Sequence, residues 1–200
     1  GRAAYESGYR VYTTVDSNFQ QSANKAIVDG LIAYGERRGF KGASGRIDPV
    51  LHDSTDKRII ELQKFPGVSN LQPVMVLRPG GDAIEILTST GIHKSLSSDS
   101  WRWTNKSPSQ LLHPGDVVYL FKAETGARLA NIPKVQGALV SLSPSDGSIL
   151  ALTGGFSFRQ SRFNRVTQAQ RQPGSNIKPF IYSSAIANGF TASTLVSGAP

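Results

Sequence analysis

The chain has 200 residues, 38% of them hydrophobic, and it carries a formal net charge of +8. A chain of this length can hold one or two domains with packed cores. It contains no apolar run near the roughly 18 residues of a membrane helix, and residues 1–6 lack the apolar centre of a signal peptide. The absence of cysteine excludes disulfides, thiolate zinc sites and thiol nucleophiles.

Neither the histidines nor the charge pattern indicates a metal or another cofactor. His52, His93 and His113 are far apart in the sequence and have no metal-ligand spacing. The basic residues are mostly scattered, apart from one group of four arginines. That group comprises Arg159, Arg162, Arg165 and Arg171. We interpret these arginines as solvated or salt-bridged, and the alternative is attraction of carboxylate-bearing or other anionic ligands.

The first elements in chain order are a strand and a helix. Residues 9–16 read YRVYTTVD, and this alternating, β-branched run predicts a strand. Apolar residues then recur at helical spacing: Phe19, Ala23, Ala26, Ile27, Gly30, Leu31 and Tyr34. We therefore expect an amphipathic helix that Asp16 or Ser17 caps and that Gly35 or Gly39 ends.

A connector and a set of short strands follow. Residues 40–70 are rich in glycine, serine and charge and indicate a boundary, with a helical turn at 58–62. Strand-length runs then alternate with turn signals such as PGGD at 79–82 and PGD at 114–116. The runs are 73–77, 83–87, 92–96, 101–103 and 117–121. Five or six short strands at this spacing predict a small all-β barrel of the OB-like type.

Two tryptophans lie close together in the predicted barrel. On a strand, Trp101 and Trp103 would share one face, where they either pack or stack on nucleic-acid bases. We favour packing, because large aromatic side chains dominate the cores of small domains. The alternative function is an OB-type binding module without chemistry, in which the basic charge binds single-stranded nucleic acid.

The C-terminal part carries a hairpin and then a catalytic motif. Residues 137–155 hold two apolar runs around the turn SPSDG, which predicts a β-hairpin. Residues 171–180 read RQPGSNIKPF. Pro179 has no N–H, so a helix that contains it must begin near Ser175. Helix positions i and i+3 share a face, so the Ser175 hydroxyl and the Lys178 amine can meet.

That pairing is chemically useful. A serine hydroxyl needs an adjacent base to act as a nucleophile, and a lysine held out of water can be that base. The ordinary alternative is that Ser175 only caps the helix. Residues 180–187 form an apolar, small-residue run that predicts a buried helix.

The string at 171–180 closely resembles the active-site motif of penicillin-binding proteins, whose motif trio is S-x-x-K, S-x-N and K-T-G. Residues 137–172 look like the start of their transpeptidase domain. The segment VYTTVD at 11–16 is similar to the linker before that domain in the class A, bifunctional members. An OB-like insertion at this place also agrees with some class A proteins of Gram-negative bacteria.

The resemblance implies a mixed fold in three parts. Residues 1–39 would be a linker strand and helix, and residues 40–133 an OB-like barrel insertion with its connector. Residues 134–200 would be the N-terminal part of an α/β penicillin-binding transpeptidase domain, an antiparallel sheet with helices. We expect a fragment, because the chain has no K-T-G or K-S-G and its only S-x-N match, at 22–24, lies in the predicted helix.

The function implied by the resemblance is that of a peptidoglycan D,D-transpeptidase, with Ser175 as nucleophile and Lys178 as candidate base. Its partners would be D-Ala-D-Ala stem peptides, β-lactam antibiotics and a second chain or missing segment with S-x-N and K-T-G, and not nucleic acid. We expect the isolated chain to be inactive and to aggregate. A membrane anchor and a glycosyltransferase domain would precede it, at the periplasmic face of a Gram-negative inner membrane. A β-lactamase or β-lactam sensor is the alternative, against which the linker and barrel argue.

Overall fold

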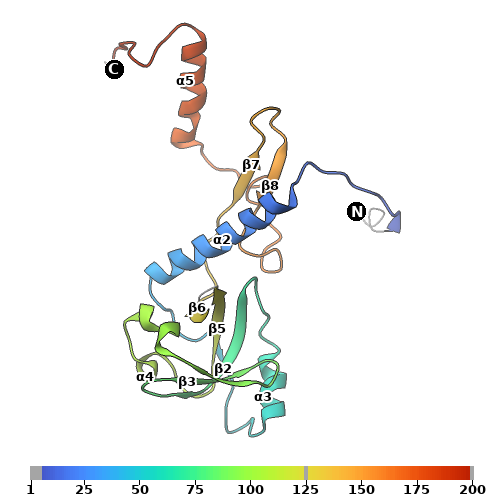
Figure 1. The fold of residues 1–200 in the computed structure, drawn as a ribbon, viewed down its shortest axis with the longest axis vertical. Helices are drawn as coiled ribbons and strands as arrows, with labels where there is room; N and C mark the ends of the chain where they lie inside the picture. The colour runs from blue at the N-terminus through green and yellow to red at the C-terminus, as the bar shows by residue number, and fades with distance from the viewer. Residues whose placement is uncertain (1–5, 124–125, 199–200) are drawn as a thin grey trace. The chain divides into compact units, whose positions relative to one another are not determined.

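The computed structural model describes residues 6–123 and 126–198, and it divides into two units, Gly1–Gln168 and Ala169–Pro200 (Figure 1). The first unit contains a long helix, a six-stranded antiparallel sheet and a separate two-stranded hairpin. The second contains one short helix after a single 3-10 turn. The expected mixed fold, with an OB-like domain and part of a transpeptidase domain, is confirmed.

The bounds of the elements are as follows. The helices are α2 (Ser17–Arg37), α3 (Thr55–Leu62), α4 (Pro108–Leu111) and α5 (Lys178–Ala187). The strands are β1 (Gly45–Arg46), β2 (Leu71–Pro79), β3 (Ile84–Thr88), β4 (His93–Leu96), β5 (Asp116–Ala123), β6 (Gly126–Ala130), β7 (Leu139–Leu142) and β8 (Ile149–Thr153). The 3-10 turns are η1 (Ser98–Ser100), η2 (Arg102–Thr104) and η3 (Gly174–Ile177).

Helix α2 has the start that its sequence predicts. The side chain of Asp16 accepts hydrogen bonds from Asn18 N at 2.8 Å and Phe19 N at 3.1 Å, which satisfies two of the free N–H groups at a helix start. The helix ends at Arg37, two residues after Gly35, and Gly39 follows with a φ of +79° that favours glycine. Its buried side chains include Val28 and Ile32, so this face packs against the sheet.

The predicted strand at 9–16 is wrong, because this segment does not form a hydrogen-bond ladder with the edge of β8. Its contacts with β8 are one backbone bond, from Asp16 N to Leu150 O at 2.9 Å, and one bond from Thr14 Oγ1 to Ile149 O at 2.7 Å. The Gln20 side chain takes the next positions on β8, where it accepts from Leu152 N at 3.0 Å and donates to Leu152 O at 3.1 Å. A single backbone bond does not make a strand ladder.

The six-stranded sheet forms the OB-like domain. Its strand order is β1-β5-β2-β3-β4, with β6 also paired to β5, and every pair is antiparallel. One face of the sheet encloses a core of aliphatic side chains and one tryptophan. The buried members are Val74, Val76, Ile84, Ile86, Leu96, Trp101, Leu112, Val118, Leu120 and Leu129. The strand prediction is confirmed for β2 to β5, whereas β6 was not expected.

The predicted strand at 101–103 is also wrong, because these residues lie at the turns η1 and η2. Trp101 is buried in the core. Trp103 Nε1 donates to Leu129 O at 3.1 Å, and its ring meets Phe40 edge-on at 6.1 Å. A buried indole N–H needs such an acceptor. Both indoles therefore pack within the domain, as the favoured interpretation held, although on turns.

One ion pair joins α2 to the sheet and was not predicted. Glu36 Oε1 lies 2.7 Å from Arg128 Nε, and the Arg128 guanidinium lies 5.3 Å from the Phe121 ring centre. Burial raises the pKa of Glu36, and the attraction of Arg128 offsets this only in part. A partly buried ion pair of this kind is weak evidence for added stability.

Candidate active site

The candidate nucleophile lies in the turn before α5. Gly174 has a φ of +53°, and Ser175 follows it within η3. Pro179 stands in the first turn of α5, close to the helix start as expected. An α-helix would bond the N–H of residue 179 to Ser175 O, but proline has none. Instead Lys178 N donates to Ser175 O, which makes this turn a 3-10 turn.

Ser175 and Lys178 are both exposed within the described structure. Side chains three residues apart in a 3-10 turn stand above one another, so the local backbone favours their approach. Among the described residues, Ser175 Oγ makes no hydrogen bond and Lys178 Nζ makes no ion pair. No residue of the unit Ala169–Pro200 that the structure describes buries either group. A base role for Lys178 therefore requires further protein to cover this turn.

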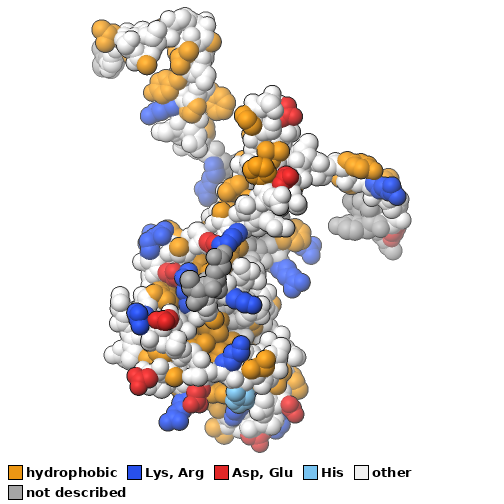
Figure 2. Space-filling model, in the orientation of Figure 1, with side chains coloured by type: hydrophobic (Ala, Val, Ile, Leu, Met, Phe, Trp, Pro, Cys, Tyr) orange, Lys and Arg blue, Asp and Glu red, His pale blue; other side chains and the backbone are white. Residues whose placement is uncertain are grey.

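Helix α5 forms as predicted, but it is not buried. Phe180 is 72% exposed and Ile186 is 64% exposed, and the helix has no buried residue. Figure 2 shows hydrophobic side chains along the segment that contains α5. The run Ile181 and Tyr182 is likewise more than half exposed. A helix with such a surface is typical of one that packs against partner structure.

The hairpin β7–β8 leads into this region and is confirmed. Its turn closes through Gly147 N, which donates to Ser143 O at 2.9 Å. After β8, the backbone of Gly154 lies against Asn164, so that a Cβ at Gly154 would overlap the Asn164 side chain. Asn164 Oδ1 accepts from Val166 N at 3.0 Å. The loop 154–166 is therefore folded back on the end of β8.

The arginines ahead of the motif have structural contacts. Arg165 Nη1 donates to Gly154 O at 3.3 Å and to Phe163 O at 3.0 Å, which secures the folded loop. The Arg162 guanidinium lies 5.8 Å from the Phe158 ring centre. We expected solvated or salt-bridged arginines, whereas the contacts of these two residues are backbone carbonyls and an aromatic ring. The sequence did not predict that Arg165 would bond to Gly154 O or that Arg162 would lie over the Phe158 ring.

Two arginines of this group also face a cleft. It has a volume of about 1050 Å³ and is lined by α2, by the segment before β2 and by the loop after β8. Lys25, Arg159 and Arg162 contribute its cations, while Phe158 and Phe163 contribute aromatic rings. The lining residues that the structure describes include no carboxylate. Lys25 is already paired with Asp29 at 2.6 Å, and attraction of anionic ligands by the two arginines stays a hypothesis.

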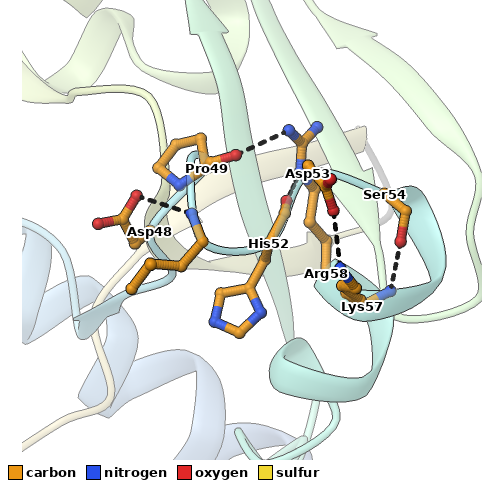
Figure 3. A network of polar contacts seen from close by, with 8 residues as sticks. Asp48, Pro49, His52, Asp53, Ser54, Lys57 and Arg58 are labelled. Carbon is orange, nitrogen blue, oxygen red and sulfur yellow. Dashed lines mark hydrogen bonds and ion pairs between the residues drawn. The ribbon is translucent and has the colours of Figure 1, made fainter.

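A polar cluster near α3 has catalytic residue types but a structural role. Ser54 caps α3 by accepting from Lys57 N at 3.3 Å, and Lys57 Nζ donates to Asp53 Oδ1 at 3.0 Å. That last bond lowers the pKa of Asp53. Arg58 Nε donates to His52 O at 2.7 Å, and Figure 3 shows the His52 ring directed away from these contacts. The described residues contain no group of three His, Asp or Glu that could hold a metal ion.

Comparison with known proteins identifies the family. Residues 40–135 match the model of the penicillin-binding protein OB-like domain. Residues 137–197, which include the motif, match the model of the penicillin-binding protein transpeptidase domain. The chain therefore belongs to the class A penicillin-binding proteins.

Several similar proteins share the name penicillin-binding protein 1A. Penicillin-binding protein 1A of Pseudomonas aeruginosa is 39% identical over all of this chain and 26% of its own length. The Escherichia coli protein of the same name is 34% identical over all of this chain and 25% of its own length. A crystal structure of penicillin-binding protein 1A from Haemophilus influenzae superposes with a TM-score of 0.84, at 36% identity, over 97% of this chain and 29% of that one.

The chain thus spans about a quarter of the length of the curated relatives that it matches. Within its described part, no helix is both long enough and apolar enough to cross a bilayer.

Proposed function

We propose that the chain supplies the serine nucleophile of a peptidoglycan D,D-transpeptidase, with Ser175 as nucleophile and Lys178 as its base. The observation that carries the proposal is the S-x-x-K turn at 175–178, inside the residues that match the transpeptidase domain model. The 3-10 geometry of this turn supports it, because it favours the approach of the two side chains. Their exposure is consistent with a site that further protein completes.

The reaction proceeds in two acyl transfers. Lys178 takes the proton of the Ser175 hydroxyl, and Oγ attacks the carbonyl carbon of the penultimate D-Ala of a stem peptide. The C–N bond to the terminal D-Ala breaks, and that residue leaves as the free amine after it gains a proton. An amine of a neighbouring stem peptide then attacks the ester carbonyl and gives up a proton to Lys178. The C–Oγ bond breaks, the amide cross-link forms, and Lys178 passes that proton to Ser175 Oγ.

A helix start helps this chemistry. The oxyanion of each tetrahedral intermediate needs fixed N–H donors, and the first N–H groups of a helix have no partner within it. The N–H of Ser175 is the donor that we assign to this role. The other donor would come from the strand that carries K-T-G, a motif that this chain does not contain. The isolated chain is therefore expected to be inactive.

β-Lactams would acylate the same serine, because their strained amide resembles the D-Ala-D-Ala end. The protein would work at the periplasmic face of the inner membrane of a Gram-negative bacterium, together with a peptidoglycan glycosyltransferase domain and a membrane anchor. The relatives named penicillin-binding protein 1A support this setting. The linker segment and the OB-like domain argue for a synthase and against a β-lactamase.

The test is covalent labelling with a fluorescent penicillin. A protein that combines this chain with the segment carrying S-x-N and K-T-G should be labelled, and Ser175→Ala should abolish the label. Ser183→Ala, a matched change in α5, should keep it. Peptide mapping should find the adduct on Ser175. Equal labelling of the Ser175→Ala variant would refute the proposal, and rapid loss of the adduct would instead favour a β-lactamase.

A further inference from the structure

A second groove lies in the first unit, where α2 ends and the OB-like domain begins. It has a volume of about 840 Å³, which is within the range of roughly 300–1,000 Å³ typical of ligand pockets. The segments 41–44 and 131–136 form two of its walls. Asn131 ties them together, because it accepts from Lys41 N at 2.8 Å and donates to Gly42 O at 3.0 Å. These two hydrogen bonds hold the two wall segments together.

Among the described residues, cations line this groove and no carboxylate does. The cations are Arg38, Lys41, Lys134 and Arg165. The first three are exposed, and Arg165 is partly buried. Glu36, in the last turn of α2, does not line the groove. Its Oε1 forms an ion pair with Arg128 Nε at 2.7 Å. Like charges gathered in this way repel one another, so an anionic ligand would lower the electrostatic energy of the groove.

The helix dipole explains only part of this group. Basic side chains favour the C-terminal end of a helix, and Lys41 Nζ donates to Arg38 O there at 2.7 Å. The Arg38 guanidinium lies 5.2 Å from the Tyr34 ring centre. Such contacts orient the cations without neutralising them. Lys134 and Arg165 come from two other segments, and the dipole of α2 does not require either of them at this place.

We propose that this groove binds an extended ligand that carries at least two oxyanions, either carboxylates or phosphates. Arginine presents a planar fork of donors that matches both groups, and lysine adds a point charge. Ser44 and Gln160 in the lining offer further hydrogen bonds to the uncharged parts of such a ligand. The proposal concerns a site apart from the Ser175 turn and does not depend on the serine chemistry.

The experiment measures binding of two defined probes to the full chain. The chain, labelled at its amino terminus and kept at nanomolar concentration, is titrated by thermophoresis with tripolyphosphate in one arm and tri-glutamate in the other. Binding should weaken as salt rises from about 50 to about 200 mM, because screening acts on exposed charges. The double variant Arg38→Gln/Lys134→Gln, which changes two of the groove's walls, should bind the preferred probe about tenfold more weakly or worse.

A matched control separates a site from general attraction to a basic protein. Lys94→Gln/Lys106→Gln removes the same charge at exposed positions outside the groove and should change affinity by less than about twofold. Lys134→Gln alone should already weaken binding, and it removes no contact described in the structure, so the fold is retained. The tighter probe identifies the ligand as carboxylate-bearing or phosphate-bearing. Absence of binding to both probes, or equal weakening in both double variants, would overturn the proposal.

Discussion

Gly115 offers a sharp test of how the OB-like domain is held together. It lies just before β5 with a φ of +91°, where side chains other than hydrogen are strained. Its N–H donates to Val76 O at 2.8 Å, and its carbonyl accepts from Ile47 N at 2.8 Å. A Cβ would overlap the Ile47 carbonyl oxygen and lie 3.0 Å from Pro49 Cδ. The alanine can therefore be accommodated only if the backbone moves and these bonds weaken.

The cost of Gly115→Ala can be worked from these contacts. The positive φ costs about 1–2 kcal/mol, and the two hydrogen bonds are worth about 0.5–1.5 kcal/mol each. Reduced entropy of the unfolded chain returns about 0.4–1 kcal/mol. The net loss of unfolding free energy is about 3 kcal/mol. Gly42→Ala is the matched control, because Gly42 has a φ of +88° and nothing within 4 Å of its Cβ position; it should lose only about 1 kcal/mol.

Urea unfolding followed by tryptophan fluorescence measures both variants. Trp101 is buried in the core of the OB-like domain, so its emission reports on that domain. The two variants should differ by about 2 kcal/mol at equal slope. If they lost the same free energy to within about 0.5 kcal/mol, the steric reasoning would be refuted and backbone strain alone would account for both.

Two further predictions concern α2. Burial raises the pKa of Glu36, so the protonated carboxyl stabilises the fold below the unfolded pKa and this stability is lost as pH rises through the folded pKa. Glu36→Gln should thus become more stable relative to the parent as pH rises above the ordinary glutamate pKa in urea unfolding, whereas a relative loss would mean that the attraction of Arg128 dominates. Asp16→Ala should lower the free energy of unfolding by about 1 kcal/mol, because Asn18 N and Phe19 N lose their acceptor. Asn18→Ala, measured in the same thermal unfolding series, should stay within about 0.5 kcal/mol, and equal losses in the two variants would argue against capping.

Local signals predicted the elements that depend on local physics. The existence of helix α2 follows from helical spacing and from the cap at Asp16, although its buried residues are Ala23, Val28 and Ile32, and of these only Ala23 was in the predicted apolar set. The β7–β8 hairpin follows from two apolar runs around a proline and glycine turn. The start of α5 follows from the missing N–H of Pro179. Each of these features is decided within a few residues of chain, which is why a single sequence suffices for it.

The errors arose where pairing partners decide the structure. The segment 9–16 has the composition of a strand, but the Gln20 side chain occupies the next part of the β8 edge. Strand β6 was missed because its sequence, GARLA, has little apolar pattern and gains its order from pairing with β5. Residues 101–103 form turns instead of a strand. From these turns Trp101 packs in the core and Trp103 Nε1 donates to Leu129 O.

The amino-acid sequence by itself determined the motif on which the proposed serine chemistry rests, since the S-x-x-K turn and its proline flank are contiguous in the chain. Only the tertiary structure decided which distant residues meet. It brought Glu36 to Arg128, tied Lys41 to Asn131, and assembled four cations from separate segments around one groove. The physical reason is that local backbone geometry sets the motif. The Glu36–Arg128 and Lys41–Asn131 contacts form only when the folded sheet brings together residues about a hundred positions apart in the chain.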